Sequence, residues 1–462
     1  MSAAGGSDAP AITLPLVERT LAIDVARAPA DVRTIAVQCV LDTLGVIIAA
    51  REEPVARLIA ESVRAEAGPA QATVLCDGQR VSAAQAALAN GTTAHALDYD
   101  DVNLNINGHP SAVLLPALLA LGEAIDASGE ALLGACVAGH EFACRAGALV
   151  QPDHYARGLH STSTVGALGA ALACARLLGL DAQRSAQAVG IAATRASGLK
   201  AMFGTDCKAW HAGLAAEDGV RAALLAQRGM TSRSDVLECR QGFAAALSRD
   251  FFPERALDPQ RWFIRDNLFK YHAACYGTHS TIECALALRV AHRLQPEQIE
   301  RILIRVERTN DGTCNIARPR SSHEAKFSLR FTCAAALCGI DTGALDSYGE
   351  ASLRDPRLQR LIELAEVELV DGWPTMQTEL RITAAGHEHS ARHDSGVALS
   401  DLDRQQQRLA AKFETLVVPV LGAGAARELA AAVAQIEQVP VRTLVSLAAR
   451  GLAAAPRAGV SR

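Results

Sequence analysis

Four short stretches of the chain concentrate ionisable side chains of the kinds that move protons and bind anions. The first, HALDYDDVNLNINGHPS (95–111), places three aspartates within a few residues of His109 and a Gly108–Pro110 turn. The other three are residues 158–166, 204–213 and 268–279, which contain His160, Lys208, His211, Lys270, His272, Cys275 and His279. All four adjoin an expected helix boundary or a Gly/Pro turn, where functional residues tend to lie. Histidines suit proton transfer near neutral pH, and the cationic groups suit an anionic small substrate.

Each stretch also has a structural interpretation. A histidine at the start of a helix is often a packed side chain, and Asp100 and Asp101 could cap the turn into the next helix. The DYDD at 98–101 also resembles the acidic motif of terpene cyclases. Those enzymes stabilise carbocations with aromatic walls, whereas this chain has ten phenylalanines, five tyrosines and three tryptophans in 462 residues. A terpene cyclase is therefore disfavoured.

A separate group of histidines, HEHSARH (387–393), lies late in the chain. His387, His389 and His393 fall on one face of a predicted strand, which could suggest a metal site. No carboxylate or cysteine partner has ligand spacing, so we interpret this strand as an exposed edge and expect no metal. The twelve cysteines are scattered without a Cys-x-x-Cys pair, which indicates small buried thiols in a reduced compartment.

Length and composition indicate a helical protein of two or three domains. Half of the residues are hydrophobic and only 4% are aromatic, while alanine and leucine, which favour helices, dominate. The net charge of -5 contains no long block of one sign, which argues against a nucleic-acid footprint or a basic membrane face. The first residues do not resemble a signal peptide, and the unbroken apolar runs fall short of a membrane span. We therefore expect a cytoplasmic protein without a nucleic-acid or membrane partner.

Hydrophobic periodicity predicts a mainly α fold with a smaller α+β part. Fully apolar, and therefore buried, helices are expected at 30–51, 111–125 and 161–180. Strands are expected at 299–308 and 367–371, with a hairpin over 378–393 that turns about Ala385–Gly386 and helices near 324–338 and 352–364. The expected organisation is a disordered tail at 1–12, a large helical domain beginning at 13–268, an inserted α+β domain at 269–398, and C-terminal helices at 399–455 that rejoin the helical domain.

Five motifs occur in order along the chain: AHALDYDD…GHPS, GLHSTSTVGALGAA, GTDCKAWHAG, FKYHAAC followed by TH, and EAKFSLRF. Together they resemble the MmgE/PrpD family over roughly residues 13–450. That family includes 2-methylcitrate dehydratases, cis-aconitate decarboxylases and iminodisuccinate epimerases. The resemblance implies a homodimer that needs no metal or organic cofactor. It also implies a large helical domain, an inserted α+β lid, and an active-site cleft between the domain and the lid.

The resemblance carries a set of active-site residues onto this chain, namely Asp98, His109, His160, Lys208 and Lys270. Cys275 stands where the decarboxylases have a histidine. The lid tyrosine expected near 315–320 is absent, and Arg318 and Arg320 occur there instead. Both departures count against cis-aconitate decarboxylase. The loop VNLNING (102–108) differs from that of the propionate-pathway methylcitrate dehydratases, so we expect substrate choice to be encoded in it.

The reactions of this family share a carbanion, or its aci-carboxylate form, beside a carboxylate. His109 and His160 could serve as acid and base in either order, while Asp98 orients a histidine. Asp100 and Asp101 are expected mostly to cap the turn. The groups expected to hold the substrate and its developing charge are Lys208, Lys270, His272, Cys275, Arg318 and Arg320.

The leading hypothesis from the sequence is a cofactor-independent hydro-lyase that dehydrates a small di- or tricarboxylate related to 2-methylcitrate. The nearest alternatives are an epimerase of an imino- or aminodicarboxylate and a decarboxylase of a cis-aconitate-like acid. A helical binding protein without catalytic activity is an alternative of a different class. It predicts that the lysines and histidines lie apart and exposed.

Overall fold

The computed structural model describes residues 10–452 and divides the chain between two compact units. Unit 1 comprises Met1–Asn267 and Asp401–Arg462, and unit 2 comprises Leu268–Ser400. Helices form most of the described chain, which confirms the predicted mainly α fold class. Of the tail expected at 1–12, residues 1–9 lie outside the described part. Ile12 is buried, and its backbone N–H donates to Glu238 Oε1 at 2.9 Å.

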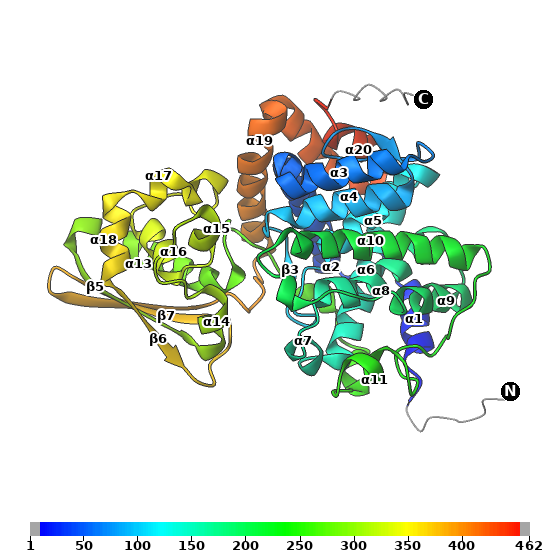
Figure 1. Ribbon diagram of the computed structural model, residues 1–462, viewed down its shortest axis with the longest axis horizontal. Helices are drawn as coiled ribbons and strands as arrows, with labels where there is room; N and C mark the ends of the chain where they lie inside the picture. The colour runs from blue at the N-terminus through cyan, green and yellow to red at the C-terminus, as the bar shows by residue number, and fades with distance from the viewer. Residues whose placement is uncertain (1–9, 453–462) are drawn as a thin grey trace. The chain divides into compact units, whose positions relative to one another are not determined.

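The described part of unit 1, residues 10–267 and 401–452, consists of helices and connecting loops with a few two-residue strands (Figure 1). Its helices are α1 (Thr13–Leu21), α2 (Ala30–Ala49), α3 (Pro54–Glu66), α4 (Ala83–Ala96), α5 (Ser111–Ile125), α6 (Gly129–Val150), α7 (Asp153–Ala156), α8 (Ser161–Leu177), α9 (Ala182–Ala193), α10 (Asp206–Gln227), α11 (Phe243–Leu247), α12 (Pro253–Ala256), α19 (Leu402–Ala434) and α20 (Val441–Ala448). The strands are β1 (Ala72–Thr73), β2 (Arg80–Val81) and β3 (Val102–Asn103), and the unit boundary falls within β4 (Asn267–Leu268). The three apolar helices predicted from periodicity are α2, α5 and α8, and most of their side chains are buried, as expected.

Glycines let the central helices of unit 1 come close together. α4 packs against α10 where Gly91 faces Gly213, and a Cβ on Gly213 would lie 2.3 Å from the backbone oxygen of Leu88. A residue with a side chain could not occupy this position unless one helix moved, because protein interiors have no spare volume at such contacts. The contact lies near the end of α4, which carries His95, and near the start of α10, which carries Lys208. It therefore sets the spacing of these two polar helix ends.

A buried ion pair joins the C-terminal helices to the N-terminal part of unit 1. α19 packs against α2, and the ammonium of Lys412 lies 2.6 Å from Asp42 Oδ1. The same ammonium donates to the backbone oxygen of Tyr99 at 2.7 Å. Burial raises the pKa of Asp42 to about 7, although Lys412 acts in the opposite direction. Lys412 thus ties a core carboxylate to the loop that contains the aspartate cluster.

Two helical segments of unit 1, Ala30–Glu52 and Leu402–Ala434, are long and apolar enough to cross a membrane by length and composition alone. Both segments are longer than the unbroken apolar runs of the sequence, which were too short to span a membrane. Most of the first segment's apolar window, 78%, is buried inside the structure, as in the core helix of a globular protein. The second is interrupted at Gly422, whose φ of 79° and ψ of 156° are not helical. Length and composition are weak evidence for a membrane span in such cases.

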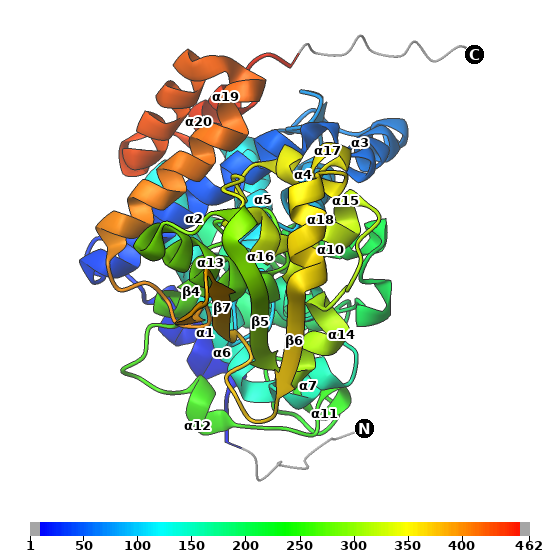
Figure 2. The same cartoon turned by 90° about the vertical axis from the view of Figure 1, so that its left-hand side faces the viewer.

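Unit 2 contains a four-stranded sheet of order β6-β5-β7-β8. The strands are β5 (Ile299–Glu307), β6 (Ala365–Val370), β7 (Gln377–Ala384) and β8 (His387–Asp394). β5 pairs in parallel with β6 and antiparallel with β7, and Figure 2 shows β5 between the two. The predicted strands and hairpin are therefore confirmed. The hairpin turns at Ala385 and Gly386, whose positive φ values of 48° and 76° suit a two-residue turn.

Helices cover one side of this sheet, where α13, α16 and α18 lie together (Figure 1). The helices of unit 2 are α13 (His279–His292), α14 (Asp311–Cys314), α15 (Ser322–Lys326), α16 (Leu329–Leu337), α17 (Glu350–Leu353) and α18 (Pro356–Leu364). The helix expected near 324–338 is divided into α15 and α16 because Ser328 caps α16. The helix expected near 352–364 is divided because Pro356 begins α18 and disfavours helical backbone before it.

Candidate active site

The loop between α4 and α5 carries the aspartate cluster of unit 1 and is held against the start of α8. A Cβ on Gly108 would lie 2.8 Å from the backbone nitrogen of Thr162, so the loop approaches α8 as closely as only glycine permits. The next residue, His109, donates its backbone N–H to Thr162 Oγ1 at 3.1 Å. At the other end of the loop, Asp98 adopts a positive φ of 50°, which turns the chain sharply after α4. Both ends of the loop are therefore fixed in place.

Asp98, His109 and Lys208 come together as predicted from the sequence. The ammonium of Lys208, in the first turn of α10, lies 2.8 Å from Asp98 Oδ1. His109 Nε2 lies 3.6 Å from the same oxygen. The exposed fraction of the side chain is 17% for Lys208, 23% for Asp98 and 13% for His109. All three side chains are therefore accessible to a small molecule. A carboxylate, an ammonium and an imidazole within one group can bind an anion and exchange a proton.

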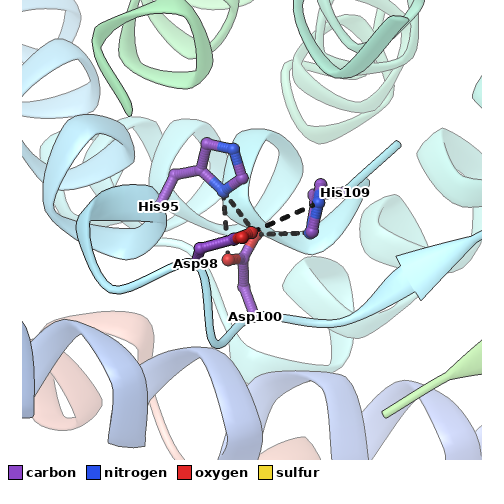
Figure 3. A group of neighbouring side chains, drawn as sticks. All are labelled: His95, Asp98, Asp100 and His109. Carbon is purple, nitrogen blue, oxygen red and sulfur yellow. Dashed lines mark hydrogen bonds and ion pairs between the residues drawn. The ribbon is translucent and has the colours of Figure 1, made fainter. Parts of the chain in front are cut away.

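Asp100 lies beneath this group and is not a turn cap. Its carboxylate oxygens lie 3.0 and 2.9 Å from His95 Nδ1, and Oδ2 lies 3.2 Å from His109 Nδ1 (Figure 3). Burial opposes ionisation, but the two facing imidazoles hold the pKa of Asp100 well below its usual range. The carboxylate that faces both histidine rings is therefore Asp100, whereas the sequence analysis had proposed only that Asp98 orients a histidine. The spacing of the residues could not reveal this, because the loop is irregular.

Asp101 performs the structural role expected of it. Its side chain accepts from the backbone N–H of Ser111 at 3.2 Å and from the Ser111 hydroxyl, so it secures the first residue of α5. It also accepts from Asn267 Nδ2 at 2.7 Å. Asp101 is fully buried. These contacts support the loop from below without facing His109 or Lys208.

His160 lies at the start of α8 and is almost fully buried. Burial, followed by the charges of His95 and Lys208, keeps the pKa of His160 well below its usual range, so the ring is neutral at pH 7. Its Nδ1 lies 3.1 Å from Nδ1 of His211. Phe203 contacts the His160 ring edge-on at 4.9 Å between centroids and lies 5.4 Å from the Lys208 ammonium. The structure thus brings all four site residues predicted in unit 1 into one neighbourhood.

Several residues of this neighbourhood, His211 among them, were not assigned to the site from the sequence. His95 lies between the rings of His109 and His160, with centroid distances of 4.6 and 5.9 Å. Asp100 was interpreted as a cap, and Phe203 was not considered. A signal for His95 was present, because it is a histidine at the end of an alanine-rich helix within the same stretch as the aspartates. Nothing in the sequence distinguished Phe203 from other surface apolar residues.

The remaining predicted site residues belong to unit 2. Lys270 is buried. His272 is also buried, and both of its ring nitrogens are engaged within unit 2, Nδ1 with the Thr342 hydroxyl at 2.7 Å and Nε2 with Glu283 at 3.2 Å. These contacts indicate a structural role for His272. Cys275 is buried, and its backbone N–H donates to the Lys326 carbonyl at 2.9 Å.

Arg318 and Arg320 lie on the segment between α14 and α15, and both are exposed. The backbone N–H of Arg320 donates to Glu324 Oε2 at 2.6 Å, which fixes that end of the segment. Within unit 1, the Lys208 ammonium lies against Asp98, whereas the Asp100 carboxylate faces His95 and His109. The charge of the Lys208 ammonium is therefore partly neutralised by the Asp98 carboxylate.

Two groups of possible metal ligands occur among residues 10–452. One comprises His95, Asp98, Asp100 and His109, whose ligand atoms lie within 4.8 Å of one another. The Lys208 ammonium beside Asp98 would repel a cation there. The other comprises Cys39, Asp101 and His140, where Ser111 and Asn267 already donate to Asp101. The three histidines of β8 belong to neither group. All twelve cysteines are free thiols, and all but Cys207 and Cys338 are buried, as predicted.

Comparisons with known proteins cover nearly the whole chain. The MmgE/PrpD N-terminal domain matches residues 16–256, and the MmgE/PrpD C-terminal domain matches residues 272–438. The cis-aconitate decarboxylase of Homo sapiens is 32% identical over 304 residues, which is 63% of this chain and 62% of that protein. The Mus musculus enzyme of the same name is 31% identical over 66% of this chain and 65% of its own length. That of Aspergillus terreus is 26% identical over 67% of this chain and 68% of its own length. The aligned part thus spans less than two thirds of the two mammalian proteins.

Proposed function

Because the chain belongs to the MmgE/PrpD family, we propose that it is a lyase that acts on a small polycarboxylate through a carbanion formed beside a carboxylate. The observation that carries the proposal is the convergence of Asp98, His109 and Lys208, three partly exposed groups able to bind an anion and transfer a proton. The similarity to cis-aconitate decarboxylases supports decarboxylation of a cis-aconitate-like acid as the first candidate reaction.

In that reaction the bond between a substrate carbon and one carboxylate carbon breaks, and carbon dioxide leaves. The electron pair stays on the substrate carbon, where conjugation spreads it toward a remaining carboxylate. The Lys208 ammonium stabilises the added negative charge, and this is worth most when the site excludes water. His109 Nε2 then delivers a proton to carbon, and solvent returns a proton to the ring. The product is an unsaturated dicarboxylate with one carbon fewer.

Dehydration of a 2-methylcitrate-like hydroxy acid is the second candidate. It needs a base for the proton beside the carboxylate and an acid for the leaving hydroxyl, and two imidazoles are available in unit 1. His160 is kept neutral by burial, as a base requires, while His109 faces the carboxylates Asp98 and Asp100, which would stabilise a protonated ring. Cys275 and the segment 315–320 without tyrosine also differ from what the family resemblance implies for decarboxylases.

A panel of di- and tricarboxylates incubated with the purified protein in deuterated water separates the candidates. Release of carbon dioxide indicates decarboxylation, a new conjugated alkene without it indicates dehydration, and deuterium in recovered substrate indicates epimerisation. Turnover of none of these acids by the folded protein would leave a binding protein as the better description and refute the lyase.

Single substitutions then test the residues. Lys208→Ala removes a group that stabilises developing charge and is expected to lower turnover by at least about 10²-fold. His160→Ala removes the candidate general base and is expected to lower turnover on the order of 10²–10⁴-fold. Lys200→Ala is the matched control, because Lys200 stacks on Tyr155 at 3.5 Å and lies outside the group. Lys270→Met tests whether the predicted lysine of unit 2 serves the same reaction. Full activity in both Lys208→Ala and His160→Ala would disprove the assignment.

A further inference from the structure

Asp100 faces two imidazoles at once. One oxygen lies 3.0 Å and the other 2.9 Å from His95 Nδ1, and Oδ2 is also 3.2 Å from His109 Nδ1. The side chains of His95 and Asp100 are fully buried, whereas His109 is 13% exposed. Figure 3 shows the Asp100 carboxylate between the two rings. The arrangement is a chain of three groups that runs from the protein interior to an accessible imidazole.

The charge states of the buried pair follow from their surroundings. Burial lowers the pKa of His95 to about 4 even though Asp100 acts to raise it, so His95 is neutral at pH 7. Asp100 is ionised, since the facing imidazoles outweigh its burial. A carboxylate can only accept hydrogen bonds, so the nitrogens that face it must carry hydrogen. His95 therefore donates from Nδ1, and His109 presents Nδ1–H to the same carboxylate.

This fixes which nitrogen of His109 can exchange a proton. With hydrogen on Nδ1, the lone pair of the neutral ring is on Nε2, which points toward Asp98 and Lys208. The Nδ1–H of His109 is not well aligned with Asp100 Oδ2, as is common for catalytic contacts before substrate binds. The imidazolium formed when Nε2 gains a proton would have Asp98 beside Nε2 and Asp100 beside Nδ1.

We propose that Asp100 and His95 are positioning residues that hold His109 in the Nδ1–H tautomer, so that Nε2 transfers the proton in the reaction. The proposal rests on the proposed function, because it assigns a role to its proton donor. Asp100 supplies the charge that orients the ring, and His95 holds Asp100 in place by donating to both of its oxygens. Neither residue touches the substrate.

Two substitutions separate positioning from simple support of the fold. Asp100→Asn keeps the shape but removes the charge, and it replaces one of the two oxygens that lie near His95 Nδ1 with an NH₂ donor. We expect kcat to fall on the order of 10³–10⁴-fold with KM changed less than about 5-fold, as for other carboxylate–histidine pairs. His95→Asn keeps an N–H donor close to the Nδ1 position, whereas His95→Leu removes it, so the leucine variant should lose at least about 10-fold more kcat.

A measurement independent of turnover completes the test. Two-bond proton–nitrogen NMR correlations of ¹⁵N-histidine protein report the tautomer of each ring, and the His109 signals are identified with a His109→Gln sample. The wild type should show protonated Nδ1 on His109, and Asp100→Asn should shift it toward protonated Nε2. Protonated Nε2 in the neutral wild-type ring would overturn the proposal even if the lyase is correct. If His109 has the expected tautomer but the protein turns over no carboxylate, the positioning of His109 by Asp100 and His95 is supported and only the proposed function is refuted. Equal losses in His95→Asn and His95→Leu would also overturn it.

Discussion

We predict that the contact between Gly91 and Gly213 controls the proposed activity of the site, although neither residue has a side chain. A Cβ on Gly213 would lie 2.3 Å from Leu88 O, and carbon–oxygen contacts of this kind relax to about 3.4 Å or more. Gly213→Ala must therefore move α10 away from α4 by on the order of 1 Å. A Cβ on Gly91 meets its nearest atom, Gly213 Cα, at 2.9 Å, so Gly91→Ala requires a smaller movement.

The same movement carries Lys208 away from Asp98, since the two residues stand at the ends of these helices. Their contact would lengthen from 2.8 Å toward about 4 Å. A misplacement of about 1 Å in a reacting group can cost roughly 10²-fold in rate. Overpacking of this kind typically costs about 1–3 kcal/mol in the free energy of unfolding. We therefore expect Gly213→Ala to lose about 10²-fold in kcat and about 1–3 kcal/mol in stability, and Gly91→Ala to lose less of both.

The assay combines steady-state kinetics with urea unfolding of the same samples. Gly424→Ala in α19 is the matched control, because a Cβ there meets no atom within 4 Å. It should leave kcat unchanged and raise the free energy of unfolding by no more than about 1 kcal/mol. Wild-type stability together with wild-type kcat in Gly213→Ala would show that the helices do not meet as described. A graded loss from Gly91→Ala to Gly213→Ala would tie the rate to the spacing of the helices.

Two further predictions concern stability. Lys412→Met removes the cation beside the buried Asp42 and should lower the free energy of unfolding in urea by about 3–5 kcal/mol. Combining Lys412→Met with Asp42→Leu should restore most of that free energy. Equal stability of Lys412→Met and the wild type would contradict the buried ion pair. Burial lowers the pKa of His95 to about 4 and that of His160 well below 6.5, so the folded chain keeps both neutral while the unfolded chain takes up protons below about pH 6.5. The contribution of the two neutral rings to stability is complete above that pH and is lost as the pH falls toward 4. The loss is up to about 1.4 kcal/mol per pH unit for each ring. A free energy of unfolding that does not change between pH 7 and pH 5 would contradict this prediction.

Regular patterns in the sequence were sufficient for most elements of the fold. The alternation of Ile302, Ile304 and Val306 identified β5, and the Ala385–Gly386 turn identified the hairpin, because these signals are local. The prediction missed the points at which a single residue ends one helix and begins another. Ser328 and Pro356 each divide a helix that hydrophobic spacing alone extended.

The site was predicted less completely than the fold. The sequence showed that Asp98, His109, His160 and Lys208 were candidates, but not which carboxylate faces which ring. That depends on the direction of each side chain in an irregular loop, which Asp98 enters with a positive φ. The assignment of Asp100 as a cap was wrong for this reason, while that of Asp101 was right, since its contact with Ser111 is local.

The bond from Lys412 to the Tyr99 carbonyl spans 313 residues and has a consequence for biosynthesis. At a synthesis rate of about 5–20 residues per second, the loop that carries Asp98 and Asp100 is synthesised about 15–60 s before Lys412. All of unit 2 is produced in that interval. Until then Asp42 has no cation beside it, and α2 lacks the helix that covers it. The core of the nascent N-terminal helices therefore stays incomplete during this interval. Slower translation or delayed release should lengthen the time for which these helices need protection from aggregation.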